Sequence, residues 1–169
     1  MHYSKKLEKF NAWLSDHKAI IFKISRAYGN DPADREDLFQ EIAFQVWRSI
    51  DAFTGKSAAS TWIYRVALNT ALAWDRTEKR REGTAERLAA QAELLHGPEE
   101  RDPRLDWIYE KIAELNDVDR SLCLLMLDGF SYREISQILG ISESNVGVKL
   151  NRLKEILSNK LESEESHES

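Results

Sequence analysis

The sequence has few residues that crosslink or stiffen a chain. Of its 169 residues, one is cysteine, three are proline and seven are glycine. Cys123 has no partner for a disulfide and lies inside the apolar run 122–127, where we expect a buried thiol. The four histidines are scattered without partners at metal-ligand spacing, so the sequence predicts no metal site and no other cofactor. A chain of this length suffices for one medium domain or two small ones.

Long apolar runs and strand patterns are also missing. No apolar stretch long enough to cross a bilayer is visible, so we expect no signal peptide, no membrane span and a cytoplasmic protein. We find no clean alternation of Val, Ile and Thr of the kind that predicts a half-buried strand. Ala, Leu, Glu, Lys and Arg dominate the long segments instead. The sequence therefore predicts an all-α fold.

The net charge of −5 is distributed unevenly. Residues 1–82 carry 14 Lys or Arg and 11 Asp or Glu, a net charge of +3, and residues 118–161 carry 6 and 5, a net charge of +1. Residues 83–117 and 162–169 carry the excess of acid, with net charges of −5 and −4. The two neutral-to-basic blocks can still bind phosphate, because the local charge decides this rather than the total.

Breaks in the helical periodicity divide the chain. Asp31 is a suitable N-cap and Pro32 suits the first position of a helix. In the first block we expect a loop over 52–61 and helices over 5–28, 32–50 and 61–81. The whole chain is predicted to form two small helical domains, with a first domain over 1–83, a linker over 84–103, a second domain over 104–161 and an acidic tail over 162–169.

The most informative segment begins at Ser131. Ser131 and Glu134 form a capping box, in which the serine caps a helix and the glutamate bonds back to the serine amide. Gly140 ends this short helix where a left-handed residue is needed, and Ser142 caps the next one. Two short helices joined in this way form a helix-turn-helix. An ordinary helical hairpin with a solvated polar face is the alternative, but the agreement of both caps with the glycine favours DNA binding.

Residues 131–154, which read SYREISQILGISESNVGVKLNRLK, resemble the C-terminal domain of extracytoplasmic-function (ECF) sigma factors. Response-regulator helix-turn-helix units share part of this pattern. Residues 141–149 are similar to family members from Bacteroidetes. The resemblance implies that this unit reads the −35 promoter element in the major groove. The contacts predicted for it are Arg133, Ser142, Glu143, Ser144, Asn145, Lys149 and Arg152.

A second resemblance lies in residues 37–41, which read D-L-F-Q-E and are similar to the D-L-x-Q-E motif of the same family. In that family the motif grips the clamp helices of the large polymerase subunit. On a helix, Asp37 and Glu41 are one turn apart with Gln40 beside them, and the apolar stripe faces the other way. Taken alone, these residues would favour a solvated acidic face over a polymerase-binding surface. The predicted polymerase contacts are Asp37, Gln40, Glu41 and Gln45.

A third segment, residues 62–69, reads W-I-Y-R-V-A-L-N and resembles the W-L-x-R-I-A-x-N segment of the family, which opens the −10 element and holds unstacked bases. Aromatic rings stack on any base, and basic side chains attract the single-strand backbone. Trp62 is equally compatible with a core position. Members often carry an aspartate where this chain has Ala73. The predicted −10 contacts are the loop residues Lys56, Ser57, Ser60 and Thr61, together with Trp62, Arg65, Asn69, Arg76 and Arg80.

Together the resemblances imply a sigma factor that binds core RNA polymerase and directs promoter-specific transcription initiation without catalysis of its own. They also imply promoter DNA and an anti-sigma factor as partners, and we expect a monomer when the protein is free. A stand-alone helix-turn-helix regulator is the main alternative, and a sigma mimic that binds a partner without supporting transcription stays open. An enzyme is disfavoured because the sequence has no nucleophile–base pair, glycine-rich phosphate loop or metal cluster.

Overall fold

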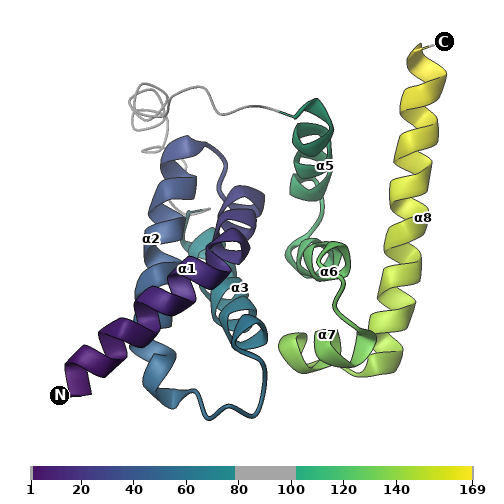
Figure 1. Cartoon of the computed structure of the whole chain (residues 1–169). Helices are drawn as coiled ribbons and strands as arrows, with labels where there is room; N and C mark the ends of the chain where they lie inside the picture. Colours follow the sequence, from purple (N-terminus) through teal and green to yellow (C-terminus); the bar gives the residue numbers. More distant parts are fainter. Residues whose placement is uncertain (1, 79–101, 169) are drawn as a thin grey trace. The chain divides into compact units, whose positions relative to one another are not determined.

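The structure, a computed structural model of the whole chain, describes residues 2–78 and 102–168 (Figure 1). Every regular element in these two ranges is helical, which confirms the all-α prediction. The chain divides into two compact units, residues 1–105 and 106–169. Residues 84–101 of the predicted linker lie outside the described residues, and Pro103 already belongs to a helix.

In the described residues 2–78 of the first unit, three long helices pack against one another: α1 (His2–Tyr28), α2 (Pro32–Ser49) and α3 (Ala59–Glu78). A short 3-10 helix, η1 (Ile50–Ala52), extends α2. Figure 1 shows the three long helices side by side. Their apolar stripes meet in a core made of Ile21, Ile24, Tyr28, Leu38, Ile42, Val46, Ile63, Tyr64, Ala67, Leu68 and Ala71. The stripe predicted for the second helix is therefore confirmed as buried.

The turn between α1 and α2 depends on a close backbone approach. The Gly29 N–H donates a hydrogen bond of 2.9 Å to the Ser25 carbonyl. A Cβ atom on Gly29 would lie 2.8 Å from that carbonyl oxygen and 2.9 Å from the backbone nitrogen of Arg35. The next residues start α2 as predicted, because the Asp31 carboxylate accepts a hydrogen bond of 2.8 Å from the Asp34 N–H.

The second unit contains most of α5 (Pro103–Ala113), together with α6 (Asp117–Leu127), α7 (Tyr132–Leu139) and α8 (Glu143–Glu168). α8 packs against both α6 and α7. The core consists of Ile112, Leu115, Leu122, Leu125, Ile135, Val146, Leu150 and Leu153. Cys123 is 2% exposed beside this core, as predicted, and burial raises the pKa of its thiol to about 11.

The turn between α7 and α8 has the predicted helix-turn-helix geometry. Gly140 adopts the left-handed conformation, with φ 71° and ψ 31°, and its N–H bonds the Ser136 carbonyl. The Ser131 and Ser142 hydroxyls accept hydrogen bonds of 3.2 Å from the Glu134 and Asn145 N–H groups. The predicted capping box is only half formed in this part of the chain. Glu134 is exposed, and its carboxylate accepts no hydrogen bond from the Ser131 N–H in this part of the chain.

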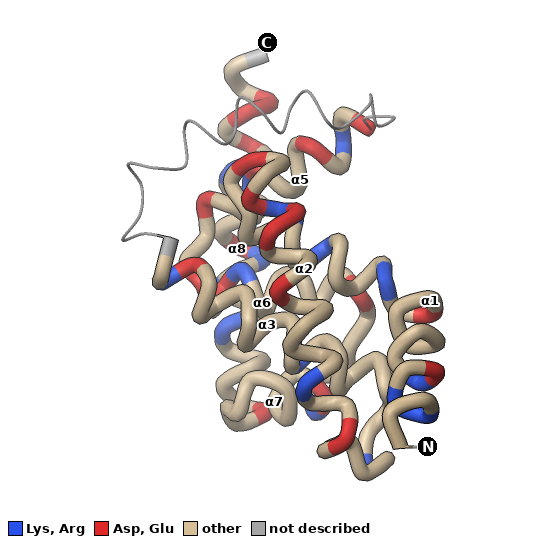
Figure 2. Tube along the Cα trace, turned by 90° about the vertical axis from the view of Figure 1, so that its left-hand side faces the viewer, with Lys and Arg blue, Asp and Glu red and all other residues tan. Residues whose placement is uncertain are grey.

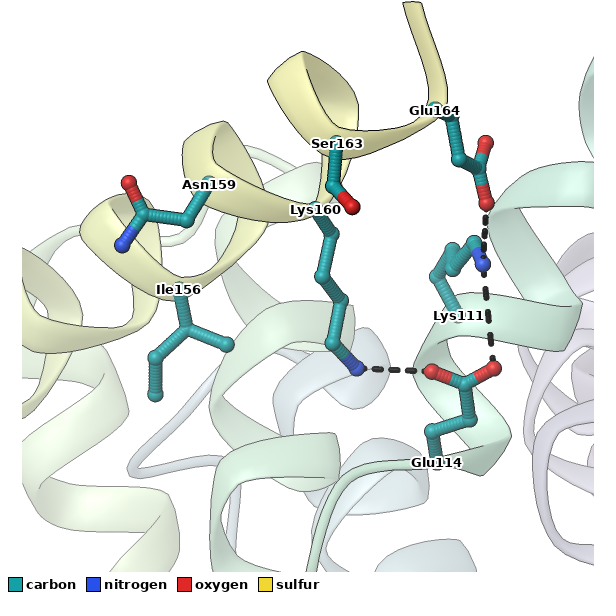
Figure 3. A pocket seen from close by; sticks show the side chains of 7 residues that line it. All are labelled: Lys111, Glu114, Ile156, Asn159, Lys160, Ser163 and Glu164. Carbon is teal, nitrogen blue, oxygen red and sulfur yellow. Dashed lines mark hydrogen bonds and ion pairs between the residues drawn. The ribbon is translucent and has the colours of Figure 1, made fainter. Parts of the chain in front are cut away.

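α8 continues beyond the point where the sequence predicts a separate acidic tail, and it reaches Glu168. Its last turns are tied to α5, because the Glu164 carboxylate accepts a hydrogen bond from the Trp107 indole and forms an ion pair with Lys111. The Lys160 ammonium lies 2.7 Å from the Glu114 carboxylate, and both residues line a surface pocket together with Lys111 and Glu164 (Figure 3). Two ion pairs, Lys111 with Glu164 and Glu114 with Lys160, therefore link α5 to α8.

Candidate functional surfaces

The polymerase-binding residues predicted on α2 lie on one solvent-facing side of the helix. Asp37, Gln40 and Glu41 are all exposed, and their spacing of three and four residues places them on one face. The opposite face, which carries Leu38 and Ile42, is buried. Gln45 is half-buried, and its amide donates a hydrogen bond of 3.0 Å to the Glu41 carboxylate. Gln45 therefore orients an acidic group of this face.

Phe44 belongs to the same face and was missed by the sequence reasoning. Its side chain is 53% exposed, although it is large and apolar. It follows Glu41 by three residues and Gln40 by four, so it lies among the predicted contacts. The Arg48 guanidinium lies 5.8 Å from its ring centroid. The sequence could have indicated this exposure, because helical spacing places Phe44 outside the buried stripe of Leu38, Ile42 and Val46.

The predicted −10 contacts fall into a loop, a first helical turn and a stripe along α3. Lys56 and Ser57 are exposed in the loop. Ser60 and Thr61 were predicted as loop residues, and this was wrong: α3 begins at Ala59, and the Trp62 N–H bonds the Ala58 carbonyl at 3.1 Å. A helix that starts two residues earlier places both hydroxyl side chains at half-buried positions in its first turn.

Basic and polar residues predicted on α3 share one exposed face. Arg65, Asn69 and Arg76 are separated by four and seven residues, and all three are exposed. Arg80 lies outside the described residues. α1 packs against α3 and carries mixed charge, since blue and red residues alternate along it in Figure 2. The α3 stripe is therefore the place in this unit where predicted nucleic-acid contacts align.

Trp62 combines a packed edge with a partly open one. The residue is half-buried, and its ring centroid lies 5.7 Å from that of Phe53 in an edge-on arrangement. Phe53 in turn packs edge-on against Trp13, at 5.0 Å. The Trp62 indole nitrogen is buried and has no hydrogen-bond partner among the described residues. A buried donor without a partner costs about 1–3 kcal/mol, so the ring is held by aromatic packing rather than by its polar group.

The predicted −35 contacts gather around the start of α8. Arg133 is exposed at the start of α7. Lys149 is half-buried because it borders the packed side of α8. The remaining predicted residues are exposed, namely Ser142, Glu143, Ser144, Asn145 and Arg152. Val148, which the sequence reasoning did not include, is 68% exposed within the same two turns.

Arg152 has a second role inside the unit. Its guanidinium lies 3.4 Å from the carboxylate of Asp119, whose side chain is only 6% exposed. The Asn116 side-chain amide donates to the same carboxylate oxygen at 2.9 Å. Arg152 therefore links α8 to α6. Its side chain is nevertheless 58% exposed, and a guanidinium has five N–H donors, so it can also bind a phosphate or a base edge.

Within residues 2–78 and 102–168, no group of three His, Cys, Asp or Glu residues is arranged to hold a metal ion. None of the helices described is both long and apolar enough to cross a membrane.

Two family models match this chain. Residues 13–81 match Sigma-70 region 2, and residues 105–157 match Sigma-70, region 4. The ECF RNA polymerase sigma-E factor of Haemophilus influenzae is 30% identical over 170 residues, which cover 87% of this chain and 89% of the relative. The ECF RNA polymerase sigma-E factor of Escherichia coli K12 is 29% identical over 142 residues, covering 76% of this chain and 74% of the relative.

Two solved complexes share the fold. The structure of the sigma factor RpoE in complex with the anti-sigma factor NepR from Bartonella quintana has a TM-score of 0.72 and 18% identity, over 92% of this chain and 98% of that chain. The structure of CnrH in complex with the cytosolic domain of CnrY has a TM-score of 0.68 and 20% identity, over 93% of this chain and 90% of that chain.

The two family matches define a transcription initiation factor that contains regions 2 and 4. With the sequence relatives, they show that the chain belongs to the ECF family of RNA polymerase sigma factors, which direct promoter-specific transcription initiation.

Proposed function

We propose that this sigma factor binds core RNA polymerase through the exposed face of α2. The observation that supports this most directly is the position of Asp37, Gln40 and Glu41 on one solvent-facing side, opposite the buried stripe. Carboxylates and an amide form charge-assisted hydrogen bonds with basic side chains of a partner. Phe44 adds apolar area at the centre of the face. Exposed aromatic anchors of this kind dominate the binding energy of many interfaces.

The nucleic-acid contacts follow from the other two surfaces. The α3 stripe of Arg65, Asn69 and Arg76, together with the half-buried Trp62, suits an unstacked −10 strand. The exposed start of α8 suits the major groove of the −35 element. In this proposal each promoter element is bound by its own domain. The first domain spans residues 1–83, the linker 84–103, the second domain 104–161 and the tail 162–169.

The free protein should bind promoter DNA weakly. Residues 1–82 and 118–161 carry net charges of only +3 and +1, while residues 83–117 and 162–169 are acidic. Non-specific affinity for DNA derives mostly from the neutralisation of phosphates by basic side chains. Polymerase therefore supplies part of the affinity. Nanomolar binding of a −35 duplex by the free, monomeric chain would contradict this and favour a stand-alone regulator.

An anti-sigma factor is the proposed inhibitor of the free chain. The support is that both structural neighbours are complexes, one with an anti-sigma factor and the other with the cytosolic domain of CnrY. We also propose a cytoplasmic location and no enzymatic activity, since the family works with RNA polymerase as an initiation factor.

Co-elution with core RNA polymerase on a sizing column tests the proposal. The wild-type chain should form a stoichiometric complex, and the variant Asp37→Lys with Glu41→Lys should lose it. The matched control is Glu8→Lys with Asp16→Lys, which makes the same charge change at exposed positions of α1. If the α2 variant binds as well as the control, the α2 face is not the binding surface. A complex without promoter-dependent transcripts would indicate a sigma mimic.

A further inference from the structure

One apolar side chain lies in the middle of an otherwise polar recognition surface. Val148 is 68% exposed, more than any other large apolar residue described in the second unit. A single exposed apolar residue is common on proteins and needs no explanation by itself. Its place in the helix-turn-helix distinguishes this one.

The geometry of α8 places Val148 opposite the core. Val146, Leu150 and Leu153 are at most 1% exposed and define the buried side of the helix. At 100° per residue, Val148 points away from their mean direction. Its neighbours on the outer face are Ser144, one turn before it, and Asn151 and Arg152, one turn after it. All three are exposed and polar, so the valine occupies the centre of a polar face.

Neither burial nor helix formation accounts for a valine at this position. Most of its surface is in water, so it contributes little apolar burial to the fold. A β-branched side chain also favours the helix less than alanine does, because its χ1 rotation is restricted. Its apolar surface is covered only when another molecule lies against the start of α8.

The surroundings permit a close approach. Gly147 has no side chain, and the nearest atoms to the place of its missing Cβ belong to the Tyr132 ring, at 3.5 Å and beyond. Ser144 is the other small residue on this side. Small side chains let a helix backbone approach a base edge closely. On the side of Ser144 and Gly147, Val148 can therefore come close to the floor of a groove.

We propose that Val148 contacts the C5-methyl group of a thymine in the −35 element and thereby favours T·A over C·G at one position. This rests on the proposed function. The thymine methyl group is the apolar feature that the bases present in the major groove, where cytosine presents an amino donor instead. A valine covers the methyl group and offers the amino donor no acceptor. Burial of one methyl group contributes about a fourfold preference.

The test uses the full chain reconstituted with core RNA polymerase on promoters with a randomised −35 element. Transcripts from wild type should show a thymine preference at one position, and Val148→Ala should lower that preference about fourfold. At that position, replacement of thymine by uracil, which lacks the methyl group, should lower wild-type transcription about fourfold and leave Val148→Ala nearly unchanged. Val118→Ala is the matched control, since Val118 is 47% exposed on α6 and should behave as wild type.

The possible failures are distinguishable. Alanine is a better helix former than valine at an exposed position, so Val148→Ala should unfold at the same temperature as wild type or a slightly higher one. Transcription with an unchanged thymine preference, or an equal uracil effect in wild type and Val148→Ala, would overturn this inference alone. A wild-type chain that gives no promoter-dependent transcripts would overturn the proposed function, and the inference with it.

Discussion

The Trp107 indole N–H donates a hydrogen bond of 2.5 Å to the Glu164 carboxylate, across 57 residues of sequence. Lys111, one turn after Trp107 in α5, pairs with the same carboxylate. The last turns of α8 are thus part of the packed second unit. A highly acidic segment is usually solvated and disordered when it has no such partners.

These contacts predict an acid-dependent loss of stability. The Lys111 hydrogen bond, followed by that of Trp107, lowers the pKa of Glu164, and Lys160 lowers the pKa of Glu114. Carboxylates with a lowered folded-state pKa stabilise the fold above their unfolded pKa, and the contribution is lost as the pH falls through the folded value. The free energy of unfolding, measured with urea at pH 7 and at a pH below 4, should therefore decrease less for Glu164→Gln than for wild type. Glu162→Gln, at an exposed position two residues earlier, should follow wild type.

Phe44→Ala should weaken binding to core polymerase at least tenfold, because it removes the apolar centre of the α2 face. The thermal stability should barely change, since the ring is 53% exposed. Phe22→Ala is a matched control, with the same change at a 52% exposed phenylalanine of α1. Equal polymerase affinity of the two variants, measured by fluorescence anisotropy, would exclude Phe44 as an anchor.

Two glycines should respond in opposite directions to alanine. Gly29→Ala places a Cβ atom within 3.0 Å of backbone atoms that cannot move freely, so it should destabilise the first unit by about 2 kcal/mol. Gly147→Ala adds a better helix former, and its Cβ would make an ordinary 3.5 Å contact with Tyr132. That change should stabilise α8 by about 0.5–1 kcal/mol. Denaturant unfolding measures the change in the free energy of unfolding for both variants. A Gly29→Ala variant that is more stable than wild type would contradict the close backbone approach at this turn.

Arg152→Ala should affect both folding and promoter use. Loss of the partner of Asp119 should lower the stability by about 0.5–1 kcal/mol, a value kept small because the guanidinium is largely exposed. It should also lower −35-dependent transcription. Lys149→Ala should lower transcription with little change in stability. If Arg152→Ala leaves unfolding unchanged while transcription falls, the link to α6 contributes nothing measurable.

Cys123 should be unreactive in the folded protein. Burial raises the pKa of its thiol to about 11, and the thiolate is the form that reacts with disulfide reagents. At pH 8, a thiol reagent should therefore label Cys123 only as fast as the protein unfolds. Between about pH 9 and 11 the unfolded chain releases the proton and the folded chain keeps it, so stability should fall as the pH rises. Cys123→Ala should show a flatter profile across this range, and rapid labelling of the native protein would contradict the burial.

Local patterns sufficed for most of the helices. The caps at Asp31, Ser131 and Ser142 and the left-handed Gly140 lie where the sequence predicts them, because each depends on residues within one turn. Short-range errors occurred at element ends. α3 starts at Ala59 instead of residue 61, since no capping side chain marked its first turn.

The sequence by itself determined the all-α fold, the helix-turn-helix and the family, because helical periodicity, caps and short motifs depend only on residues that are close together in the chain. Tertiary structure decided which polar groups remain available. The sequence predicts Arg152 only as a DNA contact, yet its guanidinium pairs with Asp119, 33 residues away. The acidic end reads as a tail, yet Trp107 and Lys111 hold it as helix. Such pairings depend on the angle at which one helix packs on another, and no local pattern encodes that angle.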